Sequence, residues 1–76
     1  MNVREILGAN VRRLRLERQL SQEALGYLAG IDRSYISEIE RGAFSVSLDK
    51  IASLAAALKV QPFELLKPSD PFEGDT

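Results

Sequence analysis

Residues 22–41 read QEALGYLAGIDRSYISEIER, and this stretch decides the fold. It contains two short segments with helical apolar spacing, separated by Gly30. Ser21 and Asp32 precede the two segments, and both residue types cap helix N-termini with their side-chain oxygens. Glycine ends helices readily because it adopts positive φ without a steric penalty. Apolar side chains spaced for helices give the two segments a shared face, namely Leu25, Ala29, Ile31, Ile36 and Ile39. Two short helices joined by a tight turn are therefore predicted.

Gly26 lies on the face of the first of these helices that would meet the second. Helices that cross steeply need a small residue where their backbones meet. We therefore expect valine at this position to disrupt the fold and alanine to be tolerated. With Gly30 in the turn, the pattern is typical of a helix-turn-helix motif.

The residues before and after this motif also favour helices. A first helix is expected to begin near Asn2, where Glu5 can complete a capping box, and to fade near Arg18. A fourth helix should begin after Ser47. Pro62 suits the first position of a short fifth helix. Prolines occur only from residue 62 on, and alternating β-branched patterns are missing, so the chain is expected to be all-α with five helices. We expect one domain over residues 1–67, followed by an acidic, flexible tail over residues 68–76.

Composition excludes several classes of function. The chain has 76 residues, which is enough for one domain. It contains no cysteine and no histidine, so thiolate metal sites, disulfides and the usual general base are missing. We expect no enzyme activity, no metal and no cofactor. No apolar run is long enough to span a bilayer, and the N-terminus lacks the apolar core of a secretion signal. A cytoplasmic location without membrane contact is expected.

The net charge of −1 hides an uneven distribution. Residues 1–20 carry five arginines against two glutamates, whereas residues 68–76 carry three acidic side chains and no basic one. The first segment is therefore basic and the last acidic. A net charge near zero argues against non-specific nucleic-acid binding. The basic N-terminal segment is nevertheless compatible with a specific contact to nucleic acid.

Several segments resemble the lambda-repressor/Cro-type helix-turn-helix DNA-binding domains, also called the xenobiotic-response-element type, across roughly residues 4–67. The segments are Arg15, the SQEALG of residues 21–26, Gly30-Ile31, the IERG of residues 39–42, the stretch Ser47 to Leu58, and Val60-Gln61-Pro62. The DRSYISEIERG of residues 32–42 also resembles the restriction–modification controller proteins, which are small members of this family. The resemblance implies a five-helix, lambda-repressor-like domain that binds DNA.

The resemblance also implies which side chains meet the bases. The helix from Arg33 to Arg41 would lie in the major groove, with Arg33, Ser34 and Glu38 facing base edges. Their chemistry fits, because arginine forks onto guanine O6 and N7 and glutamate accepts a hydrogen bond from cytosine N4. A solvated helix face remains the alternative for Arg33 and Glu38, and Glu38 could instead orient Arg33. Contacts to the DNA backbone are implied for Gln22, Tyr35, Ser37, Arg41 and Ser45.

Two further features have structural roles in this interpretation. The resemblance implies an ion pair between Arg15 and Glu40 that joins the first and third helices. The loop of residues 43–46, Ala-Phe-Ser-Val, departs from the family because it carries no charge, so its backbone contacts must come from N–H groups or Ser45.

The end of the domain suggests self-association. One recognition helix reads only a few base pairs, and two copies would double the readout. The C-terminal part holds more apolar side chains than a short fifth helix can bury, and we expect a homodimer interface there, made by Phe63, Leu65 and Leu66, with Phe72 as a further apolar residue.

The predicted function is therefore sequence-specific DNA binding that regulates transcription. A homodimer would act on a near-palindromic operator, either by repression through occlusion of a promoter or by contact with RNA polymerase. The alternative is a protein-interaction module of the same fold, antitoxin-like or coactivator-like, favoured by the apolar Leu28 on a face where relatives are usually polar. The expected partners are double-stranded DNA and a second copy of the chain.

Overall fold

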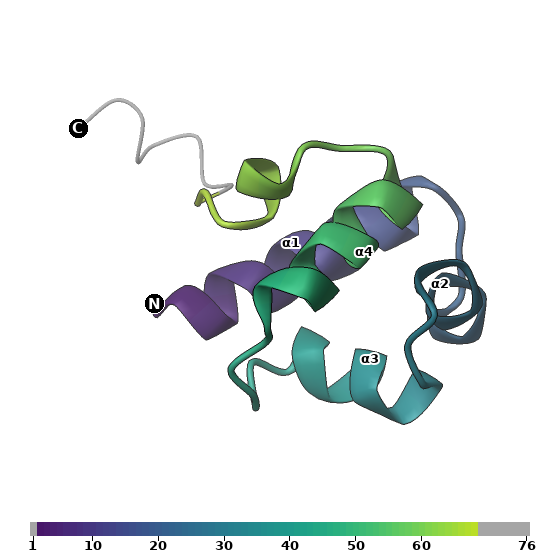
Figure 1. Ribbon diagram of the computed structural model, residues 1–76, viewed down its shortest axis with the longest axis horizontal. Coiled ribbons are helices and arrows are strands. Elements are labelled where there is room, and N and C mark those ends of the chain that lie inside the picture. The colour runs from purple at the N-terminus through teal and green to yellow at the C-terminus, as the bar shows by residue number, and fades with distance from the viewer. Residues whose placement is uncertain (1, 69–76) are drawn as a thin grey trace.

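The computed structural model describes residues 2–68, which form four α-helices and one short 3-10 helix (Figure 1). The elements are α1 (Val3–Glu17), α2 (Gln22–Ala29), α3 (Arg33–Glu40), α4 (Leu48–Leu58) and η1 (Pro62–Leu65). No strand occurs in the described residues, so the predicted all-α class is confirmed there. The predicted count of five α-helices is wrong, because η1 is a 3-10 turn of four residues.

The N-terminal caps are those that the sequence predicts. Asn2 accepts the backbone N–H of Glu5 at 3.0 Å, and the Glu5 carboxylate accepts the N–H of Asn2 at 3.0 Å, which completes the capping box. Each of the other three α-helices begins with a capping residue whose side-chain oxygen accepts a hydrogen bond from a backbone N–H of the first turn. The capping residues are Ser21, Asp32 and Ser47. These local hydrogen bonds set where each helix begins.

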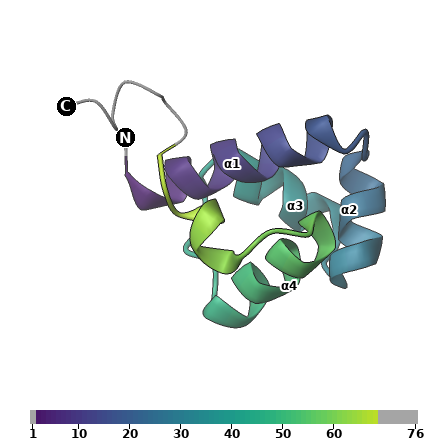
Figure 2. The ribbon, with the colours of Figure 1, turned by 90° about the horizontal axis from the view of Figure 1, so that it is seen from above.

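The helices enclose one small core. In Figure 1, α1 and α4 cross the middle of the molecule, α3 lies below them, and α2 is seen nearly end-on. Figure 2 shows α1 running along one side, with η1 next to its N-terminal half. Both views agree with the contacts, in which α1 packs on α3, α4 and η1, and α2 packs on α3 and α4. The fully buried apolar side chains are Val11, Leu25, Ile36, Leu54, Leu58 and Leu65.

Two glycines allow close backbone approach. A Cβ on Gly8 of α1 would lie 2.4 Å from the carbonyl oxygen of Ile39 and 2.8 Å from that of Glu40, so α1 and the end of α3 touch through their backbones. A Cβ on Gly26 of α2 would lie 2.4 Å from the carbonyl oxygen of Ile31. The expectation that alanine is tolerated at Gly26 is therefore wrong, since the backbone of the turn would have to move to admit its Cβ.

The C-terminal turn is held by a buried amide that the sequence did not single out. Asn10 of α1 is 1% exposed, and its Nδ2 donates to the carbonyl oxygens of Leu65 at 2.9 Å and Lys67 at 2.8 Å. Pro68 follows directly, and a residue before proline is biased away from helical backbone. The segment therefore cannot extend into a fifth α-helix.

This geometry also corrects the prediction that Leu65 lies in an exposed dimer interface. Leu65 is fully buried in the core, whereas Phe63 is 64% exposed and Leu66 37% exposed. A 3-10 turn has about three residues per turn, so residues two positions apart face different ways. Of the expected acidic tail only Pro68 is described, and Phe72 lies outside the described residues. Among residues 2–68, no helix is long and apolar enough to cross a membrane.

Candidate nucleic-acid interface

The turn between α2 and α3 fixes the direction of α3. Gly30 has φ 69° and ψ 32°, a left-handed conformation that favours glycine. The N–H of Ile31 donates to the carbonyl oxygen of Gly26 at 2.8 Å, which closes the end of α2. Ile36 and Ile39 then anchor α3 in the core. The opposite side of α3 is left at the surface, where it can meet a ligand.

The first turn of α3 carries two of the expected base-reading side chains. Arg33 and Ser34 are both exposed, and within residues 2–68 the guanidinium of Arg33 has no hydrogen-bond partner. The Ser34 hydroxyl donates to the carboxylate of Asp32, which also accepts the backbone N–H of Ser34 at 3.0 Å. Arg33 is thus available to fork onto a base edge, and the Ser34 oxygen still has a lone pair with which to accept a hydrogen bond.

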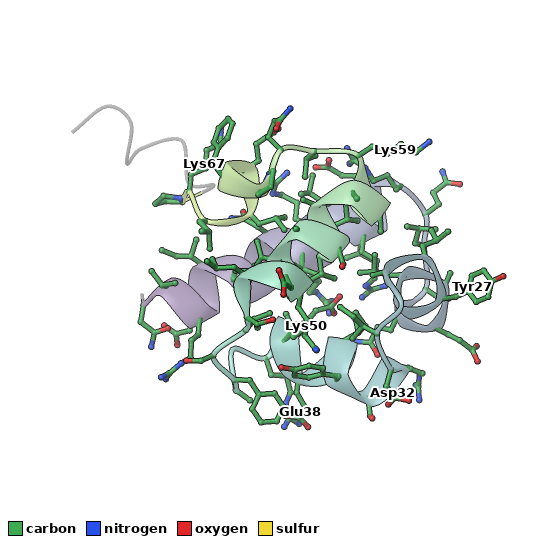
Figure 3. The ribbon with its side chains drawn as sticks, in the orientation of Figure 1. Tyr27, Asp32, Glu38, Lys50, Lys59 and Lys67 are labelled. Carbon is green, nitrogen blue, oxygen red and sulfur yellow. The ribbon has the colours of Figure 1, made fainter. Side chains whose placement is uncertain are left out.

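The carboxyl group of Asp32 has a lowered pKa. The Ser34 hydroxyl, then the Ser34 N–H, and last the positive charge of Arg33 hold the pKa of Asp32 below its usual value of 3.8. Each of these contacts favours the ionised form. Asp32 is therefore an anion at neutral pH and caps α3 as a carboxylate. Figure 3 shows it at the start of α3, at the edge of the molecule.

Glu38 follows Ser34 by one helical turn, on the same side of α3. Its carboxylate pairs with Arg41 at 2.6 Å between Oε1 and Nη2. The Glu38 side chain is 33% exposed and that of Arg41 66% exposed, so this pair lies at the surface. Figure 3 shows Glu38 on the outer side of α3. The guanidinium beside this carboxylate is that of Arg41 and not that of Arg33, which was the alternative that the sequence left open.

Tyr35 and Ser37 are half-buried at the sides of α3. The ring of Tyr35 meets the ring of Phe44 edge-on, with centroids 5.3 Å apart. The Nζ of Lys50 lies 5.4 Å from the centroid of the Tyr35 ring, an arrangement that allows a cation–π contact. In Figure 3, Lys50 projects from α4 toward α3. Lys50 is thus a cation next to α3 that the sequence analysis missed, because only the packing of α4 on α3 brings it there.

The base of α3 is tied to α1 by the ion pair that the family resemblance implied. Arg15 Nε lies 2.6 Å from Glu40 Oε2, and Arg15 Nη2 lies 3.1 Å from Glu40 Oε1. Arg15 Nη1 donates to the carbonyl oxygen of Leu20 at 2.9 Å. The two charged side chains are 8% and 4% exposed. Bidentate geometry at this burial gives a strong orienting contact between α1 and α3.

Gln22, at the start of α2, is joined to the same carboxylate. Its Nε2 donates to Glu40 Oε1 at 3.1 Å, so one amide N–H is used inside the protein. Within residues 2–68, the other amide N–H and the amide oxygen of Gln22 have no hydrogen-bond partner and can contact a ligand. The first turn of α2 also carries the positive end of the helix dipole, which favours an anion such as phosphate.

The loop of residues 43–46 holds Ser45, which is exposed and accepts a hydrogen bond from Arg4 Nε at 3.1 Å. Arg4 lies 41 positions earlier in the chain, and no local pattern could have linked the two. Two other arginines of the basic segment have structural partners. Arg18 Nε donates to the carbonyl oxygen of Leu58 at 2.6 Å, and Arg13 pairs with Glu17 at 3.3 Å.

The described residues contain no cluster of metal-ligating side chains. Among residues 2–68, no group of three or more histidine, cysteine, aspartate or glutamate side chains could hold a metal ion. Phe63 lies in η1 and Leu66 directly follows it, and Figure 1 places η1 across α1 and α4 from α3. A contact between two copies through η1 would therefore leave both α3 helices uncovered.

Comparison with known proteins places these features in context. A family model described as a helix-turn-helix domain matches residues 6–66. The control protein C.BamHI of Bacillus amyloliquefaciens is 47% identical over 66 residues, which are 86% of this chain and 82% of that protein. The crystal structure of the restriction–modification controller protein C.AhdI from Aeromonas hydrophila is 47% identical, with a TM-score of 0.79, and the match covers 82% of this chain and 94% of that one. A hypothetical transcription factor from Neisseria matches with a TM-score of 0.89 and 35% identity, over 99% of this chain and 86% of the other.

Proposed function

Because this chain belongs to the helix-turn-helix domain family, we propose that it regulates transcription by sequence-specific binding of duplex DNA, with α3 in the major groove. The observation that carries this proposal is the exposed first turn of α3, held in place by the buried pair of Arg15 and Glu40. An anchored helix with exposed polar side chains at its N-terminal end has the geometry that base recognition needs. The similarity to control proteins makes the genes of a restriction–modification system the first operators to test.

Arg33 and Ser34 are proposed as the primary base readers. Arg33 would fork onto guanine O6 and N7, and Ser34 would contact a neighbouring base edge. The Glu38 carboxylate would accept a hydrogen bond from cytosine N4 in the groove. Arg41, which pairs with Glu38, would neutralise the negative charge of that carboxylate and contact the adjacent phosphate. This pairing lowers the repulsion between Glu38 and the DNA. It lets a carboxylate work at a surface where phosphates dominate the field.

Phosphate contacts are proposed on both sides of α3. Gln22 would use its free amide N–H and the first-turn N–H groups of α2. On the side of α3 away from Gln22, the hydroxyl groups of Tyr35, Ser37 and Ser45 would donate hydrogen bonds to phosphates of the DNA backbone. Lys50, above the ring of Tyr35, would add a positive charge to that side.

A homodimer on a near-palindromic operator is the proposed assembly. A mismatch at one base pair costs about 1–3 kcal/mol, whereas specific sites exceed non-specific ones by roughly 4–10 kcal/mol, so two recognition helices reach the required discrimination more readily than one. Phe63 in η1 and Leu66 directly after it, both exposed, would form the two-fold contact, with Leu65 between them in the sequence but buried in the core. Half-sites would then lie about one helical turn, roughly 10 bp, apart.

The homodimer is tested by sedimentation of the protein at micromolar concentration. Leu66→Glu should convert a dimer to a monomer, while the matched control Leu48→Glu, at a side chain that is 80% exposed on α4, should leave the dimer intact. A wild-type monomer that also binds an isolated half-site as tightly as a full operator would refute the assembly.

A protein-interaction module remains the second candidate. Tyr27 is 87% exposed and Leu28 55% exposed on α2, and Figure 3 shows Tyr27 pointing away from the molecule. Such a surface suits contact with a protein, and RNA polymerase bound beside the operator is one such partner. Salt dependence separates the two candidates, because DNA binding weakens steeply as salt concentration rises.

The proposed function is tested by selecting bound sites from random duplexes and then comparing Arg33→Ala with the wild type. On a selected site the substitution should cost about 1–3 kcal/mol and relax the preference at one base pair. On random duplexes it should change affinity little. Equal losses on selected and random DNA would show that Arg33 contacts phosphate and does not read a base.

A further inference from the structure

The loop that follows α3 lacks a charged side chain of its own. Residues 43–46 are Ala-Phe-Ser-Val, although they follow the proposed recognition helix at the point where the DNA backbone would pass. The fold brings a charge there from another element. Arg4, in the first turn of α1, donates from Nε to Ser45 Oγ at 3.1 Å.

This proximity is built into the backbone and does not depend on the reach of a long side chain. Gly42 has φ 72°, and a Cβ built on it would lie 3.3 Å from the Cα of Glu5. The first turn of α1 is therefore packed directly against the end of α3. Arg4 is fixed at this edge by the fold, and Ser45 then orients its guanidinium.

The surface around Arg4 has room for an anion. A hollow of about 350 Å³ is lined by Asn2, Val3, Arg4 and Ser45. Within residues 2–68 the two Nη groups of Arg4 have no hydrogen-bond partner. The N-terminus of α1 adds the positive end of a helix dipole. The one carboxylate nearby, Glu5, accepts the backbone N–H of Asn2 in the capping box.

The span of α1 from Arg4 to Arg15 is somewhat longer than the DNA major groove is wide. Arg4 is eleven residues before Arg15, which adjoins Gln22 through the carboxylate of Glu40. Eleven residues at 1.5 Å each separate these points by about 16 Å along the helix axis. The major groove is about 12 Å wide, so contacts at the two ends of α1 can reach the phosphates on its two sides.

We propose that Arg4 is a DNA-phosphate contact, which supplies from α1 the positive charge that the loop after α3 lacks. The guanidinium donates from its Nη groups to a phosphate oxygen while Nε stays on Ser45. This inference rests on the proposed DNA-binding function. It assigns the N-terminal turn of α1, outside the helix-turn-helix motif itself, to the interface.

The test compares Arg4→Gln with Arg13→Gln on the full chain, using a random-sequence duplex and a duplex selected for binding. Arg13 is a matched control because it is an exposed arginine on the same helix, about two and a half turns away and so on the opposite face. The affinity of each variant is measured between 50 and 200 mM salt. One lost phosphate contact lowers the slope of log affinity against log salt by about 0.9. From 50 to 200 mM salt, the fold-loss of affinity of Arg4→Gln should therefore be about 3.5 times smaller than that of the wild type, on both duplexes.

The two proposals fail in different ways. Arg13→Gln should keep the wild-type slope, and both variants should melt within a few degrees of the wild type because each loses only exposed contacts. A wild-type slope for Arg4→Gln, or an equal reduction for Arg13→Gln, overturns the role of Arg4 while DNA binding itself stands. A wild-type protein whose DNA affinity does not depend on salt overturns the DNA-binding function.

Discussion

Removal of Arg15 tests whether the buried ion pair holds α3 in place. In Arg15→Met the apolar part of the side chain is kept, and Glu40, with a side chain 4% exposed, loses both guanidinium contacts. Only the amide of Gln22 then remains on that carboxylate. Breaking a buried pair from one side costs about 3–5 kcal/mol, because an uncompensated charge is left in the interior.

This magnitude is large for so small a domain. At about 0.05–0.15 kcal/mol per residue, the whole chain is stable by roughly 4–11 kcal/mol. With a urea dependence near 1 kcal/mol per molar, the loss should lower the urea midpoint by about 3 M or more. Arg15→Met is therefore expected to be largely unfolded near room temperature or to melt far below the wild type.

The matched control is Arg13→Met on the same helix. Arg13 and Glu17 are 41% and 54% exposed, and an exposed pair spaced in this way contributes about 0.3–0.5 kcal/mol. The double variant Arg15→Met/Glu40→Leu should regain most of the loss, because paired apolar replacement of a buried ion pair is often neutral. A loss for Arg15→Met no larger than that for Arg13→Met, or a double variant as unstable as the sum of its single variants, would refute the reasoning.

Two further substitutions test the packing and the cap. Gly8→Ala should lower stability by about 1–3 kcal/mol, because its Cβ would lie 2.4 Å from the carbonyl oxygen of Ile39, whereas helix propensity alone would raise stability by about 1 kcal/mol. A lower melting temperature for Gly8→Ala would show that the steric clash outweighs helix propensity, and a higher one would show the reverse. The lowered pKa of Asp32 means that its capping contribution is complete above pH 3.8 and is lost as pH falls through the lower folded-state value. Urea melts of Asp32→Asn should therefore lose less stability below about pH 4 than the wild type, and an unchanged pH profile would contradict the role of this carboxylate.

The elements that the sequence predicted correctly depend on neighbours in the chain. The capping box joins Asn2 to Glu5, three residues on, and the positive φ of Gly30 ends α2. Both features involve residues close together in the chain, so residue type and spacing are enough to predict the helix ends. The pair of Arg15 and Glu40 spans 25 positions and was reached only through the family resemblance.

The features that the sequence could not supply depend on tertiary contacts. Asn10 reads as an ordinary polar residue on α1, yet it is buried and binds two carbonyl oxygens more than fifty positions later. Those bonds and Pro68 limit η1 to four residues. Because a 3-10 helix has about three residues per turn, the side chain of Leu65 points into the core. Arg4 and Lys50 likewise reach the neighbourhood of α3 only because α1 and α4 pack there.

The separation of tasks within α3 has a consequence for how this protein can diverge. Ile36 and Ile39 hold the helix in the core, whereas Arg33 lies exposed in its first turn. If Arg33 reads a base as proposed, a substitution there would change the preferred operator at little cost in stability, because the side chain is exposed. Duplicated copies of such a gene can drift to separate operators by one or two changes at the outer turn, so that paralogues in one cell become insulated from each other while the scaffold beneath stays the same.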